Sequence, residues 1–299
     1  MTYEVFKKVI LERLSYDIAD PKQISVQTHY KNNGCFLDSL VILEKGCNIA
    51  PALYLNRYYA LYQGGRSFQE IYEQLLSFYE ANRSDVGIDT RFYTDFANIQ
   101  SKIAMKLIHY EQNQAFLKHV PHIRFLDLAV IFYCLLPIDS SVGNATITIF
   151  NSHLDFWDVS LDTLFQLARE NSPRILPPEW NDLCSLLKGA VPAQLYSSLI
   201  HADDPLYTMF VLTNRESLFG ASCMLYDQLI ASYARRFQSD FYILPSSIHE
   251  VILVPASSRE QMDLFSEMVR EVNRTQVADE EILSDHAYYY SREKDTILM

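Results

Sequence analysis

The feature that most constrains the fold is a recurrent order of short apolar runs and helical patterns. Two runs that resemble β-strands are followed by one amphipathic helix, and this order returns along the chain. The first pair, residues 24–30 and 36–43, flanks Lys-Asn-Asn-Gly, a sequence that tolerates the positive φ angles of a tight turn. Hairpins that alternate with helices predict an α+β fold: a mostly antiparallel sheet of repeated strand–strand–helix units, with helices packed on it.

In three of these units the second strand ends in asparagine, at Asn56, Asn151 and Asn214. An asparagine side chain at a strand exit bonds readily to nearby backbone groups and starts a turn. The repeat is explained either by an internal duplication or by the common use of asparagine at strand exits. The sequence leaves both explanations open.

Periodicity and capping patterns predict the individual elements. Ser67 and Glu70 form a capping-box pattern at the start of a helix over residues 67–83, whose buried stripe is Ile71, Leu75 and Phe78. Other helices are expected at 2–15, 99–117, 161–170, 226–237 and 259–273, and Asn-Ser-Pro at 171–173 is expected to end the third of these. Further strands are expected at 126–137, 144–150, 207–213, 221–226, 241–245 and 250–255, with 286–290 as an edge strand.

Polar and proline-rich stretches suggest how the chain is divided. We predict an N-terminal subdomain of a hairpin plus helices at 1–83, a loop at 84–98, and a larger α+β part at 99–299 packed against it. The whole chain as one domain is the alternative. Residues 173–206 are rich in proline and form a second irregular region.

Charge and apolar content exclude several classes of protein. The formal net charge of −12 argues against nonspecific binding to nucleic acid or to anionic membranes, both of which require an excess of Lys and Arg. The apolar stretch 126–137 is interrupted by Asp127 and is too short to span a bilayer, and residues 1–14 lack a signal-peptide core. The five cysteines are dispersed and never spaced as a Cys-x-x-Cys pair. We therefore expect a cytoplasmic protein with reduced cysteines.

Several segments resemble a known family. These are KNNGCFLDSLVI, NIAPALYLN, VPHIRFLDLAVIFYCLL, GNATITIFNSHLDFW, ILPSSIHEVILVP and EVNRTQVADEEILSDHAYYYSRE. They look like a domain-of-unknown-function family of Firmicutes proteins, many from gut and rumen clostridia, and the resemblance covers about residues 3 to 293. It implies one shared architecture, but it implies no activity and no catalytic residues.

Four short polar clusters are candidate sites, and three of them lie beside predicted strands. The clusters comprise Asn151, Ser152, His153, Asp155 and Asp158; Ser246, Ser247, His249 and Glu250; Ser284, Asp285 and His286; and His201, Asp203 and Asp204. Histidine and carboxylate ligands bind divalent metals in sets of three or four. A metal site, and with it a metal-dependent hydrolase or nuclease, would therefore need His153, His249 and His286 to converge with Asp155, Glu250 or Asp285.

Two other interpretations of these clusters remain open. Ser246 or Ser247 with a histidine and an acid could form a Ser-His-acid site, although the chain has no Gly-x-Ser-x-Gly elbow. The structural alternative is that Ser246–Glu250 is a hairpin connection and that Asp158 or Ser160 caps the next helix. A glycine-rich phosphate loop of the Walker or Rossmann type is absent from the sequence, so no nucleotide cofactor is predicted.

Clustered tyrosines indicate a different class of function. Tyr54, Tyr58, Tyr59 and Tyr62 lie in one short stretch, and residues 288–290 are three consecutive tyrosines, of which at least one is expected to be exposed. Exposed tyrosine is typical of interaction surfaces. The sequence therefore predicts a binding or regulatory protein that acts through protein or small-molecule contacts, with the metal-dependent hydrolase as the alternative.

Overall fold

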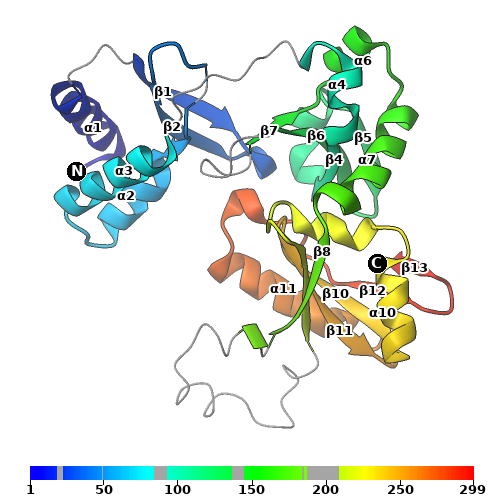
Figure 1. The fold of residues 1–299 in the computed structure, drawn as a ribbon. Helices are drawn as coiled ribbons and strands as arrows, with labels where there is room; N and C mark the ends of the chain where they lie inside the picture. The colour runs from blue at the N-terminus through cyan, green and yellow to red at the C-terminus, as the bar shows by residue number, and fades with distance from the viewer. Residues whose placement is uncertain (19–22, 49, 84–92, 137–144, 184, 187–208) are drawn as a thin grey trace. The chain divides into compact units, whose positions relative to one another are not determined.

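The computed structural model describes residues 1–18, 23–48, 50–83, 93–136, 145–183, 185–186 and 209–299 (Figure 1). The chain divides into two compact units. The first comprises Met1–Asp95 with Leu136–Thr146, and the second comprises Phe96–Leu135 with Ile147–Met299. The described strands form three antiparallel sheets accompanied by helices, which confirms the α+β class. The predicted loop at 84–98 stays a prediction, because 84–92 lie outside the described residues.

The first unit contains the predicted hairpin. Strands β1 (Gln23–Tyr30) and β2 (Phe36–Leu43) pair in antiparallel register, with Tyr30 opposite Phe36, and β3 (Leu53–Tyr54) pairs with the other edge of β2. Asn33 and Gly34 take positive φ angles of 59° and 73° in the turn. The Asn-Gly sequence therefore forms the turn for the reason that the sequence indicates.

Three helices supply the core of this unit: α1 (Tyr3–Asp17), α2 (Leu55–Gln63) and α3 (Phe68–Asn82). The predicted capping box of α3 is present, with Ser67 and Glu70 satisfying each other's backbone amides. The predicted stripe of α3 is wrong at Phe78, which is 46% exposed. Tyr79 is buried instead, because it follows Ile71 and Leu75 at intervals of four residues and Phe78 is rotated off that face.

A second sheet consists of β4 (Ile103–His109), β5 (His122–Phe125) and β6 (Leu128–Leu136), with β7 (Ala145–Thr148) paired to β6. Most of it belongs to the second unit, apart from Leu136 and Ala145–Thr146. The predicted helix at 99–117 is wrong. Strand β4 runs through its middle, between the short helices α4 (Phe96–Ile99) and α5 (Gln114–Leu117). Both faces of β4 are largely buried, and an unbroken apolar run does not distinguish a strand from a buried helix.

The other sheet of this unit has the order β13-β12-β10-β11-β9-β8. Its strands are β8 (Pro178–Asp182), β9 (Phe210–Asn214), β10 (Asp240–Ser247), β11 (Glu250–Ala256), β12 (Tyr288–Ser291) and β13 (Thr296–Leu298). Besides α4 and α5, the described part of this unit contains the helices α6 (Asn151–Trp157), α7 (Leu161–Ile175), α10 (Leu229–Phe237) and α11 (Met262–Gln276). Both faces of β10 and β12 are covered, since alternate side chains enter two separate hydrophobic clusters.

Because both faces of β12 are covered, two predictions about its three tyrosines are wrong. Strand β12 lies between β10 and β13 and is not at the edge. Its three tyrosines are all buried, at 5% exposure or less. Tyr289 packs on the side of α11 with Phe265, whereas Tyr288 and Tyr290 pack on the opposite face. A strand buried on both faces has no need for an exposed tyrosine.

Two further predictions in the second unit are wrong. Helix α7 continues through Pro173 to Ile175, and the neighbouring Ser172 is buried, donating its hydroxyl to Ala168 O and accepting the Met105 amide. Residues 221–226, predicted as a strand, lie largely in a 3₁₀ helix over Gly220–Leu225. Strand β9 is paired on both sides, with β8 and β11, so the segment that follows it cannot pair with β9 as a hairpin strand.

Candidate functional site

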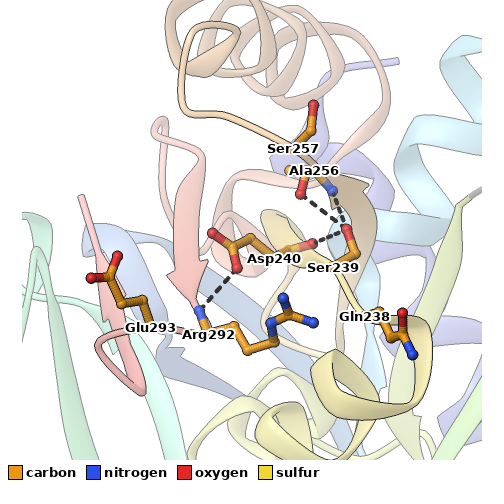
Figure 2. A pocket seen from close by; sticks show the side chains of 7 residues that line it. All are labelled: Gln238, Ser239, Asp240, Ala256, Ser257, Arg292 and Glu293. Carbon is orange, nitrogen blue, oxygen red and sulfur yellow. Dashed lines mark hydrogen bonds between the residues drawn. The ribbon is translucent and has the colours of Figure 1, made fainter.

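A polar pocket of about 370 Å³ lies where three adjacent strands of the six-stranded sheet meet the loops (Figure 2). Strand β10 begins at Asp240, β11 ends at Ala256 and β12 ends at Ser291. These three strand ends therefore lie next to one another at the same end of the sheet. The lining residues are Gln238, Ser239, Asp240, Ala256, Ser257, Arg292 and Glu293. This volume is within the range of about 300–1,000 Å³ that small-molecule sites occupy.

Backbone contacts fix one wall of the pocket. Helix α10 ends at Phe237, and Gln238 follows in the left-handed conformation, with φ of 53°, as the C-cap. The hydroxyl of Ser239 donates to the Ala256 carbonyl at 2.9 Å and accepts the Ala256 amide at 3.0 Å. The serine therefore fastens the start of β10 to the end of β11, and its hydroxyl serves this structural role.

Asp240 fastens the other side. One carboxylate oxygen accepts the Arg292 backbone amide at 3.0 Å, and the other accepts the Tyr289 hydroxyl at 2.7 Å. Burial, reinforced by the Asp240 carboxylate, raises the pKa of Tyr289, so this tyrosine stays protonated and donates at neutral pH. Both carboxylate oxygens are thus engaged in holding β10 and the end of β12 together.

Arg292 is the cation of the pocket. Its guanidinium extends past Asp240 towards Gln238, whereas the Glu293 side chain points to the opposite side (Figure 2). Within the described part of the chain, no carboxylate lies within ion-pair distance of this guanidinium. A planar guanidinium binds carboxylate and phosphate groups through two parallel hydrogen bonds. The pocket therefore offers the Arg292 guanidinium as an anion-binding group, next to the Asp240 carboxylate, each oxygen of which accepts one hydrogen bond from the protein.

The predicted cluster lies at the hairpin of β10 and β11: Ser246 and Ser247 end β10, Glu250 begins β11, and His249 is in the two-residue connection between them. His249 Nδ1 accepts the Phe219 amide at 3.2 Å and lies 3.0 Å from the Ser217 carbonyl oxygen. Its ring stacks on Phe219 at 5.6 Å between centroids. The cluster therefore anchors the loop that follows β9.

Gly220 belongs to the same contact, although no motif in the sequence marks this position. A Cβ atom at this position would lie 2.3 Å from Thr213 Oγ1 and 2.5 Å from His249 O. Thr213 donates its hydroxyl to that same His249 carbonyl at 2.8 Å. Only the absence of a side chain lets the loop approach the hairpin this closely. The scarcity of glycine in this chain was the available signal.

His153 and Asp155 lie in α6. His153 Nδ1 accepts the Phe150 amide at 3.0 Å, which caps the helix, and its ring stacks on Trp157 at 5.2 Å. Burial lowers the pKa of His153. Asp155 is exposed. Helix capping and ring stacking account for the position of this histidine. Ser160, in turn, caps α7 as predicted.

Asp285 and His286 lie in the segment before β12. Asn273 of α11 donates to Asp285 Oδ1 at 2.8 Å, and the Ser284 hydroxyl accepts the His286 amide at 2.9 Å while it donates to Asp127 at 2.7 Å. The Tyr288 hydroxyl donates to the second oxygen of Asp127 at 2.6 Å. Asp127, the single acid inside the longest apolar run, is therefore the centre of this network.

The histidines belong to three different local arrangements. Among the described residues, no group of three or more His, Cys, Asp or Glu side chains could hold a metal ion. His201, Asp203 and Asp204 lie outside the described residues. The divalent metal and the hydrolase remain predictions.

Cys47, Cys134 and Cys223 are buried and Cys35 is half-buried, whereas Cys184 lies outside the described residues. Cys134 and Cys223 are free thiols. Burial raises the pKa of Cys134 to about 11 and that of Cys223 to about 12. A nucleophilic cysteine requires a lowered pKa, so these two thiols do not have that chemistry at neutral pH.

No described helix has both the length and the apolar content needed to cross a bilayer.

Comparison with known proteins gives a family. The model of a family of unknown function, DUF5688, matches residues 3–292, which is nearly the whole chain. No curated protein and no solved structure matches the chain. The family resemblance that the sequence indicated is confirmed at this level, and the chain belongs to the DUF5688 family.

Proposed function

We propose that this protein is a binding protein that holds a small molecule with a carboxylate or phosphate group in the pocket of Figure 2. The observation that carries the proposal is the Arg292 guanidinium, which extends into a polar pocket of about 370 Å³. Asp240 accepts two hydrogen bonds from the protein. Among the described residues, no ion pair joins the Arg292 guanidinium to Asp240 or to Glu293, the two acids that line the pocket. An anionic ligand group would satisfy this cation.

The contacts of the pocket favour binding over catalysis. General acid–base chemistry requires a group that is free to exchange a proton with the substrate. The Ser239 hydroxyl and both oxygens of Asp240 are engaged with the protein itself, and no histidine is among the described residues that line the pocket. The remaining acid of the lining, Glu293, points away from the Arg292 guanidinium (Figure 2). A regulatory role, in which ligand occupancy stabilises the junction of β10, β11 and β12, fits these contacts.

A cytoplasmic location and a Firmicutes source belong to the same proposal. Cys134 and Cys223 are free thiols, which supports a reducing compartment. The source is supported by the resemblance of the quoted segments. Together, a cytoplasmic location and a Firmicutes source would place the ligand among the small anionic metabolites of a bacterial cell.

A thermal-shift screen tests the proposal. Inorganic phosphate, short mono- and dicarboxylates and amino acids are added to the full chain, to Arg292→Gln and to Lys294→Gln. Lys294 is the matched control, since it is an exposed cation two residues away that does not line the pocket. We expect at least one anion to stabilise the wild type and Lys294→Gln equally and to leave Arg292→Gln unchanged. Equal stabilisation of all three proteins, or of none, would refute the proposal.

A further inference from the structure

The first unit carries a second concave surface of different chemistry, which we call the tyrosine groove. It is lined by Ala52, Leu53, Tyr54, Arg57, Tyr58, Leu61, Gln74 and Phe78. The groove runs between two helices, because Tyr58 and Leu61 lie on one face of α2 and Gln74 and Phe78 lie one turn apart on α3. Tyr54, which precedes α2 at the end of β3, closes one end of the lining. Its floor is therefore a continuous patch of apolar and aromatic side chains.

This apolar surface is open to solvent. Phe78 is 46% exposed, although the sequence pattern placed it on the buried stripe of α3. Tyr58 is half-buried, and burial raises its pKa. The remaining tyrosines of this stretch have other roles, since Tyr59 and Tyr62 pack against Phe6 in the core. The sequence therefore keeps a phenylalanine exposed beside a half-buried tyrosine on one surface.

Cations surround one wall of the groove. The Lys31 ammonium lies 4.6 Å from the centroid of the Tyr54 ring, and it donates a hydrogen bond to the Tyr54 hydroxyl at 2.6 Å. The Arg57 guanidinium lies 5.7 Å from the same centroid. No acidic side chain is among the residues that line the groove. In a chain with a net charge of −12, this surface is locally cationic.

The size of the groove indicates the kind of occupant. Its volume is about 230 Å³, below the range of about 300–1,000 Å³ typical of sites that enclose a whole small molecule. A volume of this size accommodates one apolar side chain. Aromatic residues and arginine are also the residues enriched at the energetic centres of protein interfaces.

We propose that the tyrosine groove binds an acidic peptide segment of a partner protein, with one aromatic or leucine side chain as the anchor. The anchor packs against Tyr58, Leu61 and Phe78. Carboxylates that flank the anchor pair with Arg57 and Lys31. This surface is independent of the pocket at Arg292 and takes a ligand of a different class.

Peptide selection on the full-length protein tests this inference. A random peptide library displayed on phage is selected against the immobilised chain, and the enriched sequences are compared. We expect an aromatic or leucine residue within about four positions of Asp or Glu, a spacing that lets both groups contact one helix face. Enrichment of basic peptides, of peptides without an apolar anchor, or of no sequence at all would overturn the proposal.

Variants then locate the binding site. An enriched peptide, labelled with fluorescein, is titrated into the wild type, Phe78→Ala and Arg57→Gln, with Phe36→Ala and Lys8→Gln as matched controls. Phe36 is 62% exposed and lies in the hairpin of the same unit, and Lys8 is an exposed cation on α1. We expect a loss of about tenfold or more for the first two variants and no change for the controls. Equal affinity for all five proteins would contradict the assignment of the groove.

Discussion

Gly220 and His249 show how single residues fix the loop beside the six-stranded sheet. His249 supplies a ring nitrogen to the Phe219 amide and a carbonyl to the Thr213 hydroxyl. Phe219 itself takes a positive φ of 53°, a conformation that costs energy for a residue with a side chain. The loop stays in this conformation because His249 Nδ1 accepts the Phe219 amide and because Gly220 has no side chain that would clash with the His249 carbonyl.

A side chain at position 220 is therefore expected to destabilise the fold. In Gly220→Ala the new Cβ would lie 2.5 Å from the His249 carbonyl oxygen, so the backbone must move, and overpacking of this kind costs about 1–3 kcal/mol or more. Gly64→Ala is the matched control, since its Cβ would have only ordinary contacts at 3.5 Å and its φ is −73°. Urea unfolding measures both variants. Equal stability of Gly220→Ala and the wild type would show that the close approach is not real.

His153 predicts a dependence of stability on pH. Its pKa is lowered in the folded state, so between that pKa and the ordinary value near 6.5 the unfolded chain binds more protons. The stabilisation is fully present above the ordinary pKa and is lost progressively as pH falls from that value through the lowered pKa of the folded state. We expect the free energy of unfolding to fall more between pH 7.5 and 5 in the wild type than in His153→Asn, which keeps a hydrogen-bond acceptor for the Phe150 amide. Parallel pH profiles would contradict this account of His153.

At the scale of elements, α3 was predictable because its signal is local. Ser67 and Glu70 satisfy each other within one turn, so no distant residue decides where the helix begins. Ser67→Ala is expected to lower the free energy of unfolding of the first unit by about 1 kcal/mol. Ser77→Ala, at an exposed position inside the same helix, is expected to be neutral or slightly stabilising. Thermal unfolding followed by circular dichroism compares the two, and equal losses would argue against the capping box.

The elements that the sequence misassigned depend on distant partners. Strand β4 carries an apolar run without alternation, and it becomes a strand because β6 pairs along its length from Ile103 to His109. Residues 288–290 become an inner strand because Thr296–Leu298 return to pair with them. Neither partner can be identified from local periodicity, since both pairings are set by the tertiary fold.

The candidate site was only partly predictable for the same reason. The hairpin connection at Ser246–Glu250 is a local feature, and the sequence identified it. The pocket joins Ser239, Ala256 and Arg292, which come from three separate segments, and none of them belongs to a recognisable motif. Arg292 follows the tyrosine strand directly, so its position could be inferred only after the order of strands in the sheet was known.

At the scale of the whole molecule, the two proposed binding surfaces lie in different compact units. The pocket at Arg292 is polar and within the size range of small-molecule sites, whereas the tyrosine groove is smaller and mainly apolar. The two surfaces predict separable defects, because a substitution in one unit leaves the lining of the other unchanged.

The most direct test of the central claim is isothermal titration of the full chain with the anion that stabilises it most. We predict one ligand per chain for the wild type and for Lys294→Gln. For Arg292→Gln we predict a loss of affinity of about 10- to 100-fold, as expected when a charged hydrogen-bond donor worth about 1.5–3 kcal/mol is removed. Unchanged affinity and stoichiometry in Arg292→Gln would contradict the claim that this pocket is the binding site.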